Sequence, residues 1–290
     1  MIWPLRVLWA AMPVTAGAVI ADAVSDWSPG TRVVAIALAW IGWGAVILGL
    51  FIVRPPSLTA TRIGAPVAVA VTVVVALTDD SSAALIGVTL VQALATTALA
   101  WSVPFSLLCA QSVAYGDERR FPLRTPPGLF VGPIPIAVAL VGVGVAAGPL
   151  MLGDRRWLLG SCVTVVGVAL AAAATRSLHV LATRWIVLVP AGVVVVDPMT
   201  LAEPVLLTHG SLASLTPAPP RADPGVDIVD LRLGAVARSL RIDLSSPAAL
   251  ARRPRRHRPL TTTDVTALLV APVRPDALCD TYTQRRPGRV

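Results

Sequence analysis

The hydrophobic and polar positions divide the chain into two parts that meet near residue 175. In the first part, long apolar runs without charge alternate with short polar segments, whereas the second part has only short apolar runs. A helix needs about 20 apolar residues to cross about 30 Å of hydrocarbon, because its backbone polar groups must be bonded internally there. The first part therefore predicts a transmembrane all-α bundle of six helices, at residues 5–24, 33–53, 63–78, 83–108, 129–152 and 157–175.

The first of these helices has an alternative interpretation, and the fourth contains a proline. Arg6, the apolar run after it and the small residues Ala21-Asp22-Ala23 are also compatible with a signal peptide and its cleavage site. The acidic residue inside that site, and the apolar runs that follow, favour an uncleaved helix. Residues 83–108 are long enough for one helix that can be kinked at Pro104.

Residues 176–290 are predicted to form a small β-rich α+β domain. Strands at 184–189 and 193–196 flank a turn at Pro190-Ala191-Gly192 and predict a hairpin. Alternating apolar positions at 227–233 and 238–244 predict a second antiparallel hairpin. We expect further strands at 204–208 and 262–271, loops at 216–225 and 245–259, and a terminal helix at 275–286.

Composition narrows the class of protein. The chain is 55% hydrophobic and 14% charged, against about 25% charged residues in soluble domains, which excludes a soluble enzyme or a nucleic-acid module over most of its length. All 24 basic residues are Arg, and the absence of Lys and Asn indicates a GC-rich bacterial genome. The three cysteines are far apart in the sequence, so we expect no disulfide framework, no metal site and no cofactor.

Arginine in the short loops predicts how the helices are oriented, because it marks the cytoplasmic side of a membrane. The second and fourth loops, 54–62 and 117–127, hold five Arg, and the first, third and fifth loops hold three. The expected topology is a multi-pass protein of the bacterial inner membrane with both termini in the cytoplasm. The motif Asp154-Arg155-Arg156 in the fifth loop runs against this bias.

Few residues inside the predicted helices carry chemistry. Gln92 is the one strongly polar side chain deep in a helix; it can line a pore or bind substrate, but an interhelical hydrogen bond is the favoured interpretation. Gly132, Pro133 and Pro135 punctuate the fifth helix and are candidates for a hinge or a cavity. The structural alternative is that they shape a packed bundle.

The densest positive charge in the chain is Arg252, Arg253, Arg255, Arg256 and Arg258, five Arg in seven residues. Such clusters attract anionic lipid headgroups at a cytoplasmic membrane face. A solvated loop that keeps positive charge in the cytoplasm is the plainer interpretation. Nucleic acid is the least favoured partner, because no aromatic residue interleaves the cluster.

Two stretches resemble a known class of protein. Residues 184–197 (RWIVLVPAGVVVVD) and 268–286 (LLVAPVRPDALCDTYTQRR) are similar to those of bacterial, actinobacterial-type membrane proteins that carry a C-terminal pleckstrin-homology-like (PH-like) domain. The resemblance covers roughly residues 150–286. It implies a cytoplasmic partial barrel closed by a helix, which serves for binding or scaffolding and brings no catalytic residues.

The expected function is therefore a non-enzymatic, membrane-bound interaction or regulatory module, with lipid headgroups and other proteins as partners. No nucleophile–base pair, protease motif or ligand cluster is evident in the sequence. The alternative is a small transporter or channel that uses the glycine- and proline-rich fifth helix.

Overall fold

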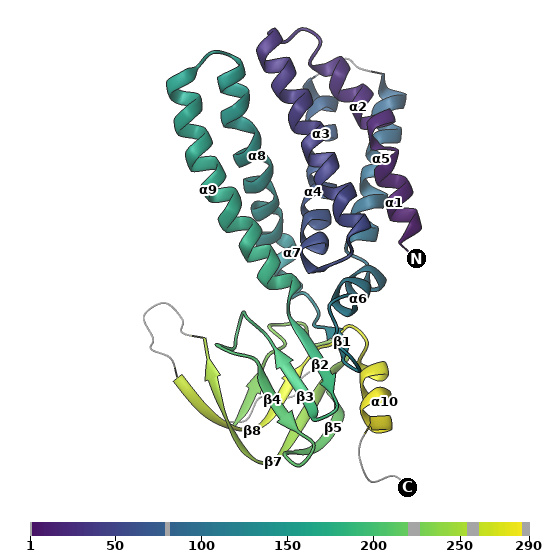
Figure 1. Cartoon of the computed structure of the whole chain (residues 1–290), viewed down its shortest axis with the longest axis vertical. Helices are drawn as coiled ribbons and strands as arrows, with labels where there is room; N and C mark the ends of the chain where they lie inside the picture. The colour runs from purple at the N-terminus through teal and green to yellow at the C-terminus, as the bar shows by residue number, and fades with distance from the viewer. Residues whose placement is uncertain (1, 79–81, 220–226, 254–260, 286–290) are drawn as a thin grey trace. The chain divides into compact units, whose positions relative to one another are not determined.

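A computed structural model of the chain describes residues 2–78, 82–219, 227–253 and 261–285 (Figure 1). The chain forms two compact units. The helical unit comprises Met1–Cys109 and Pro133–His179, and the β unit comprises Ala110–Gly132 and Val180–Val290. The chain therefore passes from one unit to the other at three places in the sequence.

Within the residues that the structure describes, the helical unit contains six segments that are long and apolar enough to cross a membrane, which confirms the six apolar helices predicted from the sequence. The first segment is a pair of helices, α1 and α2, that meet at Ala11, just before Pro13. The segments are α1 (Trp3–Ala10) with α2 (Met12–Ala23), α3 (Pro29–Phe51), α4 (Pro55–Thr78), α5 (Ala83–Ala100), α8 (Pro133–Gly153) and α9 (Trp157–Ala182).

Several helix boundaries differ from the prediction, among them the end of α9, which lies at Ala182 rather than at 175. Helix α4 begins at Pro55 rather than at 63, because its polar first turns are satisfied by hydrogen bonds, such as that from the Thr61 hydroxyl to Ser57 O. The predicted helix 83–108 is two helices, α5 and α6 (Val103–Gln111), with Pro104 in the first turn of α6, where no backbone N–H is needed. The fifth long helix begins at Pro133, after the one-turn helix α7 (Gly128–Val131).

Glycine allows very close packing between helices of this unit. A Cβ atom built on Gly144 of α8 would lie 2.5 Å from the carbonyl oxygen of Gly167 in α9. One built on Gly148 would lie 2.2 Å from Oγ1 of Thr164. Small residues let membrane helices approach where no hydrophobic force drives them together. This contact sets the spacing of α8 and α9, which run side by side in Figure 1.

The β unit contains two four-stranded sheets and helix α10 (Pro275–Arg285). The strand orders are β1-β2-β3-β4 and β5-β7-β8-β6. The predicted hairpin at 184–196 is confirmed, because β2 and β3 pair antiparallel, and α10 matches the predicted terminal helix. The strands are β1 (Arg119–Pro122), β2 (Trp185–Val189), β3 (Gly192–Val196), β4 (Val205–Thr208), β5 (Leu212–Ala218), β6 (Ile228–Asp230), β7 (Ser239–Arg252) and β8 (Thr261–Val270).

Strand β1 was not predicted, and it changes the division of the chain. It lies before α7–α9 in the sequence, yet it pairs antiparallel with β2 after them, with Arg119 opposite Leu188 and Pro122 opposite Trp185. The α7–α9 segment is thus inserted between two neighbouring strands of one sheet. The predicted boundary at 175/176 would remove β1 from the sheet to which it belongs.

Two further predictions for this region are wrong. Residues 227–233 do not form a hairpin with 238–244, because β6 pairs parallel with β8 and β7 pairs with β5 and β8. The two predicted loops are partly strand, since β5 extends to Ala218 and β7 to Arg252. Their prolines are accommodated because Pro217 is on an edge strand and Pro247 falls in a β-bulge between Asp243 and Ala248.

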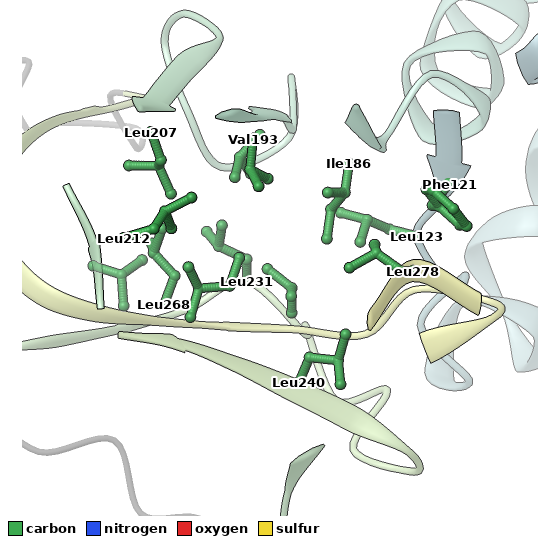
Figure 2. Packing of buried hydrophobic residues seen from close by; sticks show 14 of the residues in the cluster. Phe121, Leu123, Ile186, Val193, Leu207, Leu212, Leu231, Leu240, Leu268 and Leu278 are labelled. Carbon is green, nitrogen blue, oxygen red and sulfur yellow. The ribbon is translucent and has the colours of Figure 1, made fainter. Parts of the chain in front are cut away.

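The core of the β unit lies between the inner faces of its two sheets and α10 (Figure 2). Ile186, Leu240 and Leu268 are almost completely buried there, and Leu278 of α10 packs against the same cluster. The sheets also meet at two corners, where Leu123 pairs with Pro272 and Leu201 with Arg252. The two sheets and α10 therefore share one hydrophobic core.

Candidate functional site

The basic segment continues the longest hairpin of the β unit. Strands β7 and β8 pair as far as Arg252 and Thr261, so residues 253–260 connect their paired ends. Arg252 and Arg253 are described by the structure, whereas Arg255, Arg256 and Arg258 lie outside the described residues.

The base of this segment is anchored to the connection between β3 and β4. The backbone N–H of Arg253 donates to Thr200 O at 2.9 Å, and its guanidinium donates to Pro198 O. Ala202 N–H donates to Ala251 O at 2.9 Å. Arg253 is thus engaged in holding the hairpin, a role that sequence reasoning missed because its partners are backbone carbonyls about 55 residues away.

A buried ion pair lies at the open end of the β2–β3 hairpin. Arg184, two residues after α9, binds Asp197 through two hydrogen bonds of 2.8 Å, from Nε to Oδ1 and from Nη2 to Oδ2. The guanidinium also donates to Leu231 O at 2.8 Å and to Arg124 O at 3.4 Å. Leu123 N–H donates to Arg184 O at 2.9 Å, so the chain before α7 is joined to the chain after α9.

Several carboxylates of the β unit form ion pairs with arginine. Asp230 and Asp243 each pair with an Arg two residues away along the chain, Arg232 and Arg241 respectively. Burial by itself would raise the pKa of Asp230, but the hydrogen bonds and charge of Arg232 outweigh it and hold that pKa below its ordinary value. Burial would also raise the pKa of Asp243. The hydrogen bonds from Ser214 and Arg241, together with the charge of Arg241, outweigh burial and lower that pKa. Within the described residues, no group of three His, Cys, Asp or Glu side chains is placed to hold a metal ion.

Gln92 lies on α5 and bonds two other helices. Its amide nitrogen donates to Leu8 O of α1, and its side-chain oxygen accepts from the Thr15 hydroxyl of α2, both at 2.7 Å. The side chain is 8% exposed. Both polar ends of the amide are therefore engaged in holding three helices together.

Gly132, Pro133 and Pro135 lie at the start of α8 rather than inside it. Gly132 ends α7, and the two prolines occupy the first turn of α8, where their missing N–H groups cost no hydrogen bond. The interruption expected in this region is found at Gly132, which separates α7 from α8, and α8 itself then continues to Gly153.

Two arginines of the helical unit, Arg6 and Arg62, bind the carbonyl ends of other helices. Arg6 donates to Leu50 O at the end of α3 through Nε and Nη2, at 3.1 and 2.9 Å. Arg62 donates to Ala100 O at the end of α5 and to Oγ of Ser106. A cation is favourable there because the last carbonyls of a helix carry partial negative charge. In the sequence, each of these arginines is visible only as a charge near the end of an apolar run. Its hydrogen-bond partner cannot be predicted, because the partner lies on a helix that is distant along the chain.

In comparisons with known proteins, no protein-family model, no curated protein and no solved structure matches the chain.

Proposed function

We propose that this chain is a multi-pass protein of the bacterial inner membrane whose cytoplasmic β unit is a PH-like, non-enzymatic interaction or regulatory module. The β unit binds anionic lipid headgroups through the basic segment 252–258. The observation that carries the proposal is that this segment, with five Arg in seven residues, begins at Arg252, the last residue of β7.

Charge and anchoring both support lipid binding. Each basic residue near an anionic membrane surface contributes about 1 kcal/mol. Because Arg253 and Ala251 are hydrogen-bonded to the β3–β4 connection, the base of the segment is held in place before a ligand arrives. Prior ordering of a binding element lowers the entropy that binding costs.

The architecture supports attachment to a membrane rather than catalysis. Six apolar segments tether the β unit, and the chain passes between the two units three times. The described carboxylates with lowered pKa, Glu118, Asp230 and Asp243, are each bonded to an arginine of the same unit. The transporter alternative has less support, because the break at Gly132 precedes α8 and α8 itself is continuous from Pro133 to Gly153.

The test uses the full-length protein in nanodiscs. A 176–290 fragment would lack β1 and leave the edge of β2 unpaired. Hydrogen exchange of residues 245–265 is compared in discs of zwitterionic lipid and discs with added anionic lipid. We expect slower exchange in anionic discs, with loss of the difference at high salt, because 1 M salt screens such charges beyond about 3 Å.

The variant Arg255→Gln/Arg256→Gln/Arg258→Gln should abolish the lipid dependence while Arg253 keeps its structural bonds. The matched control, Arg119→Gln/Arg238→Gln/Arg274→Gln, removes equal charge elsewhere on the β unit and should leave the dependence intact. Equal exchange of the unmodified protein in both kinds of disc contradicts lipid binding.

Orientation is tested separately by labelling single cysteines in intact cells, in a background without Cys109, Cys162 and Cys279. A cysteine in place of Asp80 should react with an impermeant reagent, and one in place of Arg238 should react only after lysis. Labelling of the second site in intact cells contradicts a cytoplasmic β unit.

A further inference from the structure

The helical unit contains an open cavity of about 370 Å³ at the end where α2 meets α3 and α8 meets α9. Its wall includes Trp27, Ser28 and Thr31 from the α2–α3 side, and Met151, Asp154 and Arg156 from the α8–α9 side. Ligand pockets in proteins range from about 300 to 1,000 Å³, so the cavity has room for a small headgroup.

The two charged residues of the wall are paired with each other but keep binding capacity. Arg156 Nε donates to Asp154 Oδ2 at 2.9 Å, and the two side chains are 62% and 47% exposed. Over the described ranges, no hydrogen bond engages Oδ1 of Asp154 or either terminal nitrogen of Arg156. A carboxylate oxygen and a two-nitrogen guanidinium edge therefore remain available, side by side, to one ligand.

This arrangement matches a ligand that carries both charges. The planar edge of Arg156 suits a phosphate or a carboxylate, and Asp154 suits an ammonium group. Trp27, whose side chain is 44% exposed, adds an aromatic face of the kind that attracts ammonium groups.

The position of the cavity favours phosphate over carboxylate as the anionic group. Helix α3 begins at Pro29 and α8 ends at Gly153, so the cavity lies at the ends of two helices of membrane length. Tryptophans such as Trp27 are enriched at this level, where lipid headgroups lie.

The two sides of the cavity are held together by a close backbone contact. A Cβ atom built on Gly153 would lie 2.8 Å from Cα of Thr31, and one built on Gly30 would lie 2.5 Å from Gly153 O. Ser28 caps α3 by accepting from Thr31 N–H, and the two hydroxyl groups are 2.9 Å apart. The wall is thus in place before a ligand binds.

We propose that this cavity binds a zwitterionic headgroup that carries an ammonium and a phosphate group, with the phosphate on Arg156 and the ammonium between Asp154 and Trp27. The headgroup belongs either to a phosphoethanolamine lipid or to a free phosphoethanolamine ester. The site is independent of the basic segment 252–258.

The experiment uses the full-length protein in detergent and measures the dissociation constants of three probes by calorimetry. The probes are a short-chain phosphatidylethanolamine, phosphoethanolamine itself and a short-chain phosphatidylglycerol, which lacks the ammonium group. We expect the first probe to bind at least about tenfold more tightly than the third, because one charge-assisted hydrogen bond accounts for about that factor. Binding of phosphoethanolamine as well assigns the site to the free ester, and its failure to bind assigns the site to lipid.

Two variants and their controls decide the location. Asp154→Asn and Arg156→Gln should each weaken the phosphatidylethanolamine probe about tenfold. The controls are Arg155→Gln and Asp26→Asn, which remove charge beside the cavity but not from its wall, and they should bind as the unmodified protein does. An unchanged melting temperature verifies that each variant is folded. Equal binding of the first and third probes, or unchanged binding by both wall variants, overturns the proposal.

Discussion

Arg184 and Asp197 form a bidentate ion pair from which solvent is almost completely excluded. Both hydrogen bonds are 2.8 Å long, and the side chains are 1% and 0% exposed. Asp197 also accepts from Met199 N–H at 3.1 Å, and Arg184 donates to Leu231 O. Removing a charge from water costs several kcal/mol, so each of these groups depends on the other.

Arg184→Met should therefore destabilise the β unit by about 3–5 kcal/mol, because Asp197 would remain buried without its partner. Hydrogen exchange of β2 and β3 amides in the full-length protein measures this loss. The control is Arg241→Met, whose ion pair with Asp243 is partly exposed and contributes less than about 1 kcal/mol. The double variant Arg184→Met/Asp197→Leu should recover much of the loss. Equal effects of the two single Met variants would show that the buried pair is not essential.

Gly144→Ala should separate α8 from α9, because the added methyl group has no room beside Gly167 O. Overpacking of this kind costs about 1–3 kcal/mol. A melting curve of the detergent-solubilised protein provides the measurement. Gly42→Ala in α3 is the matched control, because nothing lies within 4 Å of its added Cβ, and it should not lower the melting temperature. A stable Gly144→Ala variant contradicts the close contact.

Gln92→Leu should lower stability by about 1 kcal/mol, since interhelical hydrogen bonds in membranes average about 0.6 kcal/mol each. The control is Thr97→Val on the same helix. The Thr97 hydroxyl donates only to Ala93 O of its own helix, so its removal should change the stability very little. Both are measured by reversible unfolding in mixed micelles. No difference between the two variants would argue against Gln92 as a link between α1, α2 and α5.

Stability of the β unit should fall as the pH is lowered through about 4. The pKa of Asp230 is below its ordinary value in the folded chain, so the unfolded chain takes up protons first. The stability contributed by its ion pair with Arg232 is complete above the ordinary pKa and is lost as the pH falls toward the folded one. Chemical denaturation between pH 7 and 3 tests this, and Asp230→Asn should flatten the decline. An equally steep decline in that variant would assign it to other carboxylates, such as Glu118 and Asp243.

The candidate sites were predictable only where their chemistry is local. The basic segment is visible in the sequence because its charges are neighbours. The cavity beside Trp27 was not predicted, because Asp154 and Arg156 are more than 120 residues away from Trp27 along the chain. In the sequence, Arg155 and Arg156 are notable only because they lie in a loop that is expected to face away from the cytoplasm, where Arg is less frequent.

The sequence by itself determined the apolar segments and the β2–β3 hairpin. Hydropathy and turn chemistry act over about 20 residues or fewer, so an uncharged run or a Pro-Ala-Gly turn predicts structure without knowledge of the rest of the chain. The same locality explains why the terminal helix at Pro275 was predicted correctly.

Only the tertiary structure decided which strands are neighbours and where the two units divide. Strand β1 joins β2 across the α7–α9 insertion, and β6 pairs parallel with β8 rather than with β7. These choices depend on burying Ile186, Leu240 and Leu268 in one core and on pairing Arg184 with Asp197. Such contacts join residues that are distant in the sequence. The free energy that favours them arises only when the whole core is assembled, so no single segment can predict them.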